Sequence, residues 1–159
     1  MKPTARRCTG RASPWPSPGQ AVSWAGRRWP ARAKDRRMFI VMASPECAPI
    51  AKAGGLGDFV HGLCRELSSR GHAVELVLPK YDSLRFDRIQ GLHKVYGDLW
   101  VPFYDKAIRC DVEYGEVDGI ACFFIDAHDE HRFFHRGKIY GDADDPERFA
   151  FFSRAVMEF

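Results

Sequence analysis

The sequence predicts an α/β fold with a parallel β-α-β start, a β-hairpin region and a final helix. The first observation is a short apolar run, Met38–Ser44, typical of a strand buried on both faces of a parallel sheet. The second is a glycine loop followed by apolar residues at helical spacing. The third is another apolar run, Ala73–Pro79, ended by its proline. Parallel strands require such a crossover between them.

The helix of this unit is expected to begin at Leu56 and to end near Arg70. Its apolar positions follow the i, i+3, i+4 pattern. They are Leu56, Phe59, Val60, Leu63, Cys64 and Leu67. Gly71 comes directly after Arg70, and glycine commonly ends a helix because it accepts a left-handed conformation.

Three further strands are expected at residues 94–104, 107–117 and 120–127. Asp118 and Gly119 separate the last two of these runs. This dipeptide strongly favours a two-residue hairpin turn, so we expect these two strands to be antiparallel neighbours.

A last helix is expected to open at Pro146, because proline suits the first turn of a helix. One face of this helix would carry Phe149, Phe152, Ser153 and Val156. The sequence reaches Phe159 without a signal that ends a helix. We therefore expect residues 38–159 to be the truncated start of a larger α/β domain.

Residues 1–37 are a different kind of sequence. They hold 10 of the 24 lysines and arginines, one acid, five of the ten prolines and no helix or strand period. We expect a disordered basic leader, which is either an upstream extension or an organelle transit peptide.

Residues 38–159 hold 14 basic and 20 acidic residues, a balance of −6, which argues against a nucleic-acid partner. Apolar runs fall short of the ~20 residues that span a bilayer, so no membrane association is expected.

Cysteine and histidine spacing predicts no metal site. The five cysteines are Cys8, Cys47, Cys64, Cys110 and Cys122. Their number is odd and no C-x-x-C occurs, so free thiols are expected. His128, His131 and His135 crowd a polar loop, but their spacing matches no strong zinc pattern. We expect a solvated loop there.

The candidate site is the loop Lys52-Ala53-Gly54-Gly55-Leu56-Gly57-Asp58. It lies between a strand and a helix, at the edge of the sheet where α/β folds bind ligands. Helix N-termini bind anions, and a preceding lysine adds positive charge, so a phosphate-bearing ligand is expected. A P-loop would need its lysine after the glycines, and the dinucleotide fingerprint would need a third glycine. A structural loop, in which Gly54 and Gly55 only permit positive φ, stays open.

Ordered blocks of residues 38–159 resemble bacterial glycogen synthases and plant starch synthases. Residues 51–58, AKAGGLGD, resemble the Lys-x-Gly-Gly-Leu-Gly-Asp signature of that family. Residues 78–89, LPKYDSLRFDRI, and residues 133–159, from FFHRG to AVMEF, resemble later segments. The resemblance implies a GT-B fold, in which two Rossmann-like domains face a cleft. It also implies transfer of glucose from ADP-glucose to the non-reducing end of an α-1,4-glucan with retention, without a metal or other cofactor.

By this resemblance Lys52 would contact the phosphates of ADP-glucose, and Gly54 and Gly55 would line the same pocket. Asp58 would position sugar hydroxyls or interact with the helix dipole. The catalytic residues would lie beyond Phe159, so the chain alone is expected to be inactive.

Other residues near the site are expected to be structural. Arg136, Tyr140 and Asp145 would shape a loop over the cleft. Lys80-Tyr81-Asp82 would form a satisfied surface turn. Cys47, without an evident adjacent base, would serve in packing.

Two alternative functions remain open. One is an α-glucan-binding or regulatory fragment without catalysis, and the other is a different nucleotide-dependent Rossmann enzyme. The location implied by the resemblance is the bacterial cytoplasm, or the plastid if residues 1–37 are a transit peptide.

Overall fold

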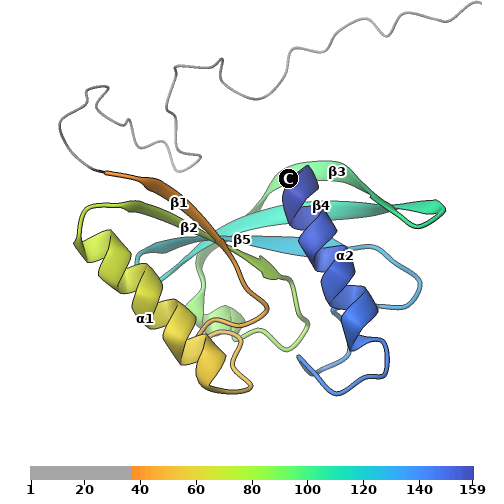
Figure 1. The fold of residues 1–159 in the computed structure, drawn as a ribbon, viewed down its shortest axis with the longest axis horizontal. Coiled ribbons are helices and arrows are strands. Elements are labelled where there is room, and N and C mark those ends of the chain that lie inside the picture. Colours follow the sequence, from red (N-terminus) through yellow and green to blue (C-terminus); the bar gives the residue numbers. More distant parts are fainter. Residues whose placement is uncertain (1–36) are drawn as a thin grey trace, which may run out of the picture. The chain divides into compact units, whose positions relative to one another are not determined.

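Five strands and two α-helices make up residues 37–159, the part of the chain that the computed structural model describes (Figure 1). The expectation for the basic leader therefore lies outside the described residues. In chain order the elements are β1 (Phe39–Ala43), α1 (Gly55–Ser69), β2 (Ala73–Pro79), the 3-10 turn η1 (Phe86–Arg88), β3 (Gln90–Phe103), β4 (Lys106–Val117), β5 (Ile120–Ala127) and α2 (Asp145–Glu158). Neither α-helix in this part of the chain is long and apolar enough to cross a membrane.

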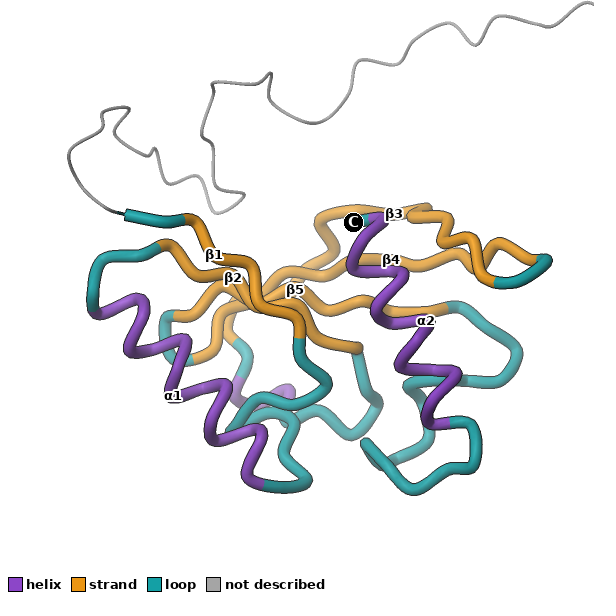
Figure 2. The backbone as a smooth tube through the Cα atoms, in the orientation of Figure 1, coloured by secondary structure: helices purple, strands orange, loops and turns teal. Residues whose placement is uncertain are grey.

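The strands form one mixed sheet in the order β1-β2-β5-β4-β3. β1 pairs with β2 in parallel, and β2 pairs with β5 in parallel. β4 is antiparallel to both of its neighbours. The predicted parallel start and hairpin region are thus confirmed. Because β1, β2 and β5 run in the same direction, the loops that follow them meet at one edge of the sheet (Figure 2).

The turn between β4 and β5 has the predicted hairpin geometry. Asp118 and Gly119 have φ values of 49° and 79°. A two-residue turn with two positive φ values matches the twist of its strands, which explains the Asp-Gly sequence.

The two helices cover opposite faces of the sheet. On α1, the Cys64 sulfur lies 3.4 Å from the Met42 sulfur of β1. At the end of α2, the Phe159 ring lies 5.3 Å from the ring of Phe123 on β5, centroid to centroid. Strand register places Met42 and Phe123 on different faces, because successive residues of a strand alternate. Each helix thereby covers one face of the sheet.

The end of α1 is set by Gly71, as predicted. Gly71 has φ of 87°, and its N–H donates to the Ser68 carbonyl over 2.9 Å. The His72 N–H donates to the Leu67 carbonyl over 3.1 Å. These two bonds satisfy carbonyls that the end of a helix leaves unpaired.

The expectation that the first strand is buried on both faces is wrong. Phe39 and Val41 of β1 are 55% and 51% exposed. β1 lies at the edge of the sheet, and α1 covers only the face that carries Met42. An apolar run therefore identified the strand, but not what covers it.

The predicted apolar face of the last helix is shifted by about one residue. The buried residues of α2 are Arg148, Phe151, Phe152 and Ala155. Ser153 is exposed, and Phe149 and Val156 are half-buried. The shift arises because the helix buries an arginine, which a search for apolar periodicity cannot include.

Candidate functional site

The glycine loop is folded around one buried carboxylate, that of Glu46. One Glu46 oxygen, Oε2, accepts the N–H of Ala53 over 2.8 Å and the N–H of Gly54 over 2.9 Å. The other oxygen accepts the Tyr140 hydroxyl over 2.9 Å. Glu46 is only 3% exposed. It therefore fixes the backbone just before α1 and joins it to a segment 94 residues later.

The hydrogen bonds keep Glu46 ionised. Burial by itself would raise the pKa of this carboxyl, because a low-dielectric surrounding disfavours charge. Three hydrogen bonds outweigh this effect of burial and lower the pKa of Glu46 below its ordinary value of 4.5. The donors are the N–H groups of Gly54 and Ala53 and the Tyr140 hydroxyl. Burial and the neighbouring Glu46 charge raise the pKa of Tyr140, so its hydroxyl keeps its proton and donates it.

Glycine occurs at the three positions of the loop for different structural reasons. A Cβ on Gly57 would lie 3.2 Å from the Ala48 nitrogen and 3.3 Å from the Ala51 oxygen. Gly57 therefore allows α1 to pack closely on the loop, and a side chain there would press on backbone atoms. A Cβ on Gly54 or Gly55 would meet no atom of the described chain within 4 Å.

Backbone conformation does not require Gly54 or Gly55 either. Gly54 is extended, with φ of −149°, and Gly55 is the first residue of α1. The interpretation that these glycines permit positive φ is wrong. The surface above them is open, and it lies at the N-terminus of α1, where Gly54 offers no side-chain cap. An open N-terminus of this kind suits an anion.

Lys52 and Asp58, two of the predicted site residues, lie on either side of the open glycines and form an ion pair. The distance from Lys52 Nζ to Asp58 Oδ2 is 2.7 Å. Both side chains are about half exposed, so the pair contributes little to stability. The ion pair instead positions the Lys52 amino group beside the first turn of α1. The structure thus brings together Lys52, Gly54, Gly55 and Asp58.

A pocket of about 440 Å³ adjoins the loop and is rich in cations. Lys52, Arg85 and Lys138 line it, together with Ser83 and the residues next to Lys52 in the loop. Arg85 pairs with Asp87, and Lys138 pairs with Asp142. These cations come from the loops that follow β1, β2 and β5, which is the convergence that parallel pairing produces.

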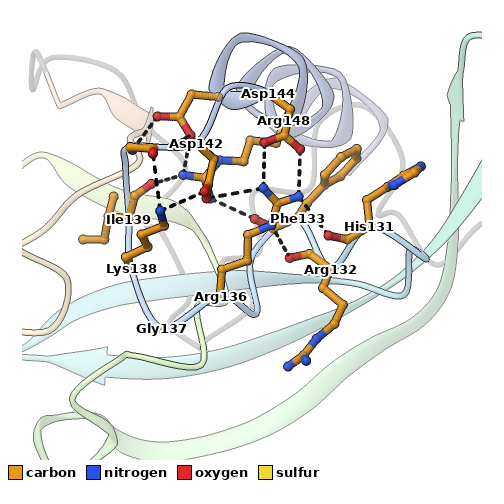
Figure 3. Close-up of polar contacts among 12 residues, drawn as sticks. His131, Arg132, Phe133, Arg136, Gly137, Lys138, Ile139, Asp142, Asp144 and Arg148 are labelled. Carbon is orange, nitrogen blue, oxygen red and sulfur yellow. Dashed lines mark hydrogen bonds and ion pairs between the residues drawn. The ribbon is translucent and has the colours of Figure 1, made fainter.

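The segment that carries Tyr140 is held by Arg136 (Figure 3). Its guanidinium donates to both carboxylate oxygens of Asp144, over 2.6 and 2.7 Å. It also donates to the carbonyls of His131 and Arg132, over 2.8 and 3.1 Å. This planar fork ties both ends of the loop together, a geometry that lysine cannot reproduce.

The buried arginine of α2 holds the same segment from the other side (Figure 3). Arg148 donates to the Phe133 carbonyl over 2.9 Å and also to the carbonyl of Ile139. Its Nε donates to Asp145 over 2.9 Å. Arg136, Tyr140 and Asp145 thus shape this loop, in agreement with the expectation.

The histidines of the polar loop do not converge on one point. His128 Nε2 lies 3.0 Å from Asp111, His135 Nε2 lies 3.1 Å from Asp126, and His131 stacks on Phe133. Burial would raise the pKa of Asp111, but the hydrogen bonds from Lys94 and His128 lower it to about 2. His128 and His135 therefore anchor the loop to β4 and β5, whereas the contact of His131 lies within the loop.

Three carboxylates lie together at the start of α2, namely those of Asp142, Asp144 and Asp145. Each of them is bound by a cation. The cations are Lys138 and Arg136 for Asp142, Arg136 for Asp144 and Arg148 for Asp145. The cluster is thereby neutralised by neighbouring side chains.

The expectation that Lys80-Tyr81-Asp82 forms a satisfied surface turn is wrong, because Tyr81 is buried and its hydroxyl has no hydrogen-bond partner among the described residues. Lys80 Nζ donates to Glu113 over 2.7 Å and to Asp126 over 2.8 Å. Tyr81 is fully buried, and Asp82 accepts the Gly137 N–H over 2.8 Å. The segment therefore fastens the later loop to the core.

Sequence reasoning missed one residue of the site, Glu46. The available signal for Glu46 was an acid shortly after a strand, in a loop otherwise apolar and rich in proline.

Cys47, beside Glu46, is fully buried, and burial raises the pKa of its thiol to about 12. That agrees with a packing residue.

The fold is that of an incomplete Rossmann-like α/β domain of the GT-B type. Residues 39–159 match the starch synthase catalytic domain family, and the chain belongs to that family. The structure resembles the catalytic domain of starch synthase IV from Arabidopsis thaliana bound to ADP and acarbose, with a TM-score of 0.75 and 40% identity. That match covers 77% of this chain and 25% of the plant chain.

Curated relatives agree with this family. Glycogen synthase 1 of Nitrosococcus oceani is 59% identical over 122 residues, and glycogen synthase 1 of a Synechococcus strain is 61% identical over 122 residues. Each match covers 77% of this chain and 25% of the relative. The probable starch synthase 4 of Arabidopsis thaliana is 40% identical over 76% of this chain, and 12% of that protein is covered. The chain thus spans about a quarter of the length of its bacterial relatives.

Proposed function

We propose that residues 38–159 form the N-terminal part of the catalytic domain of a glycogen or starch synthase. The reaction is transfer of glucose from ADP-glucose to the non-reducing end of an α-1,4-glucan, with retention. The observation that carries this proposal is the open backbone at Gly54 and Gly55, beside Lys52 and the N-terminus of α1. Neither packing nor conformation requires glycine at these two positions, whereas the approach of a ligand to the backbone does.

The chemistry of the substrate fits this surface. The leaving group of the reaction is a nucleoside diphosphate, on which negative charge develops as the glycosidic bond breaks. A lysine amino group and helical N–H groups directed at that charge stabilise the transition state. Asp58 holds Lys52 in place until the diphosphate competes for it. Asp58 then becomes available to accept a hydrogen bond from a sugar hydroxyl.

The loop between β5 and α2 supports the site by position. Arg136 and Arg148 bind the segment from which Tyr140 donates to Glu46. The resulting rigidity matters because a catalytic surface loses rate when its donors are misplaced by about 1 Å.

Binding of ADP-glucose to the chain tests the proposal. In a titration of the 15N-labelled chain, we expect ADP-glucose to shift the amide signals of Gly54 and Gly55. Lys52→Ala should weaken the affinity about tenfold, which is typical for loss of a charged phosphate contact. Arg65→Ala, an exposed cation elsewhere on α1, is the matched control and should bind as the wild type does.

Two results would contradict the proposal. One is unchanged affinity in Lys52→Ala. The other is a shift of the loop by NAD with none by ADP-glucose, which would favour the alternative of another nucleotide-dependent enzyme.

We further propose that glucose transfer requires the part of the family's length that this chain does not span. The purified chain should therefore incorporate no glucose from ADP-glucose into glycogen, and measurable incorporation would refute this. A bacterial cytoplasmic location is proposed from the bacterial relatives, and recovery of the protein from plastids would exclude it.

A further inference from the structure

The cationic pocket beside the glycine loop is lined by charge of one sign. Its charged lining residues are Lys52, Arg85 and Lys138, and all its other lining residues are uncharged. The two open glycines and Asp58 are not part of this lining, so the pocket and the glycine surface adjoin without coinciding. Lys52 borders both surfaces, because it lines the pocket and pairs with Asp58 beside the first turn of α1.

Hydrogen bonds join the three loops that form the walls of this pocket. The Arg85 N–H donates to the Ile50 carbonyl over 3.0 Å, which joins the loop after β2 to the loop after β1. The Gly137 N–H donates to the Asp82 carboxylate over 2.8 Å, which joins the loop after β5 to the loop after β2. Ile50 and Ile139 are buried and give the wall an apolar part. The pocket is therefore preformed, and a ligand need not order its walls.

The two outer cations of the pocket pair with carboxylates that lie outside its lining. Arg85 lies 3.3 Å from Asp87, and both side chains are more than half exposed. Lys138 lies 2.8 Å from Asp142, and the lysine side chain is 47% exposed (Figure 3). Ion pairs in contact with water contribute little to stability. A ligand with more than one negative charge can therefore replace these carboxylates at the two cations.

A phosphate group fits this lining. Phosphate monoesters carry about two negative charges near neutral pH, and a cleft lined by one sign of charge concentrates ions of the other sign. The guanidinium of Arg85 can bind two phosphate oxygens at once, and the lysines add point charges. Ser83 also lines the pocket and offers a hydroxyl donor. A volume of about 440 Å³ leaves room for a small organic body on the phosphate.

We propose that the cationic pocket is a second anion site, which binds orthophosphate or a small phosphate monoester and competes with ADP-glucose for Lys52. A phosphate in the pocket attracts the Lys52 amino group away from Asp58 and from the open glycines. ADP-glucose then loses a cation that its diphosphate would contact. Binding in the pocket stands on its own, whereas the competition rests on the proposed function. Because coupling between two sites is reciprocal, ADP-glucose must weaken phosphate binding by the same factor.

Titrations of the 15N-labelled full chain at constant ionic strength test the site. The probes are orthophosphate, ribose 5-phosphate and ribose. Both phosphates should shift the amide signals of Ser83 and Lys138, and ribose should shift neither signal. Ribose 5-phosphate that binds more tightly than orthophosphate would show that the rest of the pocket holds the organic body. Otherwise the phosphate group alone is the ligand.

Two arginine variants test the residues. Arg85→Ala should weaken phosphate binding about tenfold, which is typical for loss of a charged contact. Arg88→Ala is the matched control and should bind phosphate as the wild type does. Arg88 is similarly exposed and lies beside the same Asp87, but it does not line the pocket. Near-saturating orthophosphate should raise the Kd for ADP-glucose about fivefold or more in the wild type and in Arg88→Ala, and much less in Arg85→Ala.

The outcomes separate this proposal from the proposed function. Absence of amide shifts at Ser83 and Lys138 with either phosphate would overturn the proposal, as would equal losses in the two arginine variants. Phosphate-induced shifts confined to the open glycines would also overturn it, because the anion would then occupy the glycine surface. Unchanged ADP-glucose affinity in the presence of bound phosphate would overturn the competition. If ADP-glucose fails to bind while phosphate binding depends on Arg85, only the proposed function fails.

Discussion

Glycines in one short loop differ in what they contribute. Gly57 is pressed against the backbone of residues 48–51, whereas Gly54 and Gly55 face open space. The same amino acid therefore serves packing at one position and access at the other two. The distinction matters because it separates stability from binding, and substitution by alanine can measure each independently.

The first prediction compares Gly57→Ala with Gly55→Ala. Gly57→Ala should lower the free energy of unfolding by about 1–3 kcal/mol, because the new methyl group meets backbone atoms that cannot rotate away. Gly55→Ala should raise it by up to about 1 kcal/mol, because alanine favours a helix. Urea unfolding of both variants measures the two changes. Gly55→Ala should nevertheless bind ADP-glucose more weakly, so equal binding by both variants would contradict the assignment.

Glu46 provides a second residue-scale prediction, which concerns pH. The folded-state pKa of Glu46 lies below its ordinary value of 4.5. The ionised carboxylate therefore contributes its full stabilisation of the folded state at pH values above 4.5. This stabilisation is lost as the pH falls through the lower folded-state pKa, because both states then bind the proton. Glu46→Gln should cost about 1 kcal/mol near neutral pH, since charged acceptors bind N–H groups more strongly than neutral ones.

The measurement is urea unfolding of wild type and Glu46→Gln across the acid range. The difference between them should shrink as the pH falls and should vanish once Glu46 is protonated. A difference that stays constant with pH would show that the charge of Glu46 is not what stabilises the loop.

At the scale of elements, the decisive contact is between α2 and the loop before it. Arg148 is fully buried, yet its guanidinium satisfies two backbone carbonyls and one carboxylate. Through them α2 fixes the segment that presents Tyr140 to Glu46. A helix far from the glycine loop in sequence thus determines the geometry of that loop.

The third prediction is that Arg148→Met lowers the free energy of unfolding by about 3–5 kcal/mol, because buried polar partners are left unpaired. Arg154→Met is the matched control on the same helix. It removes only a surface i, i+4 pair with Glu158, which is worth about 0.5 kcal/mol or less. Hydrogen exchange of residues 137–144 should accelerate in Arg148→Met alone. Similar losses in the two variants would argue that α2, and not this arginine, holds the loop.

Sequence patterns predicted most elements because those elements follow local rules. Apolar periodicity located α1 and β2, and Asp118-Gly119 located a turn. The patterns missed Glu46 and Arg148, because buried charged residues are recognised only by partners that are remote in sequence. The same limit explains the shifted face of α2. Lys52, Gly54, Gly55 and Asp58 were assigned to the glycine site from the order of strand, loop and helix and from the family resemblance. Their contact with a ligand stays a prediction.

At the scale of the whole sheet, one edge strand is exposed on one face within residues 37–159. β1 lies at the edge of the sheet in the described part of the chain, and it exposes Phe39 and Val41 on the face that α1 does not cover. The chain spans about a quarter of its bacterial relatives, and a parallel sheet extends by adding strands to such an edge. We therefore expect this edge to be the part of the chain that pairs most readily with another strand.

The last prediction follows from that edge. An exposed strand with an apolar face pairs with other strands, so the chain should self-associate as its concentration rises. Val41→Lys places a charge on this face, where the side chain can extend into water, and it should shift the population toward monomer without lowering stability appreciably. Met157→Lys introduces the same charge at an exposed position of α2 and should leave association unchanged. Sedimentation velocity over a concentration series measures both variants. A wild type that stays monomeric throughout, or an equal effect of the two lysines, would show that β1 is not the surface of association.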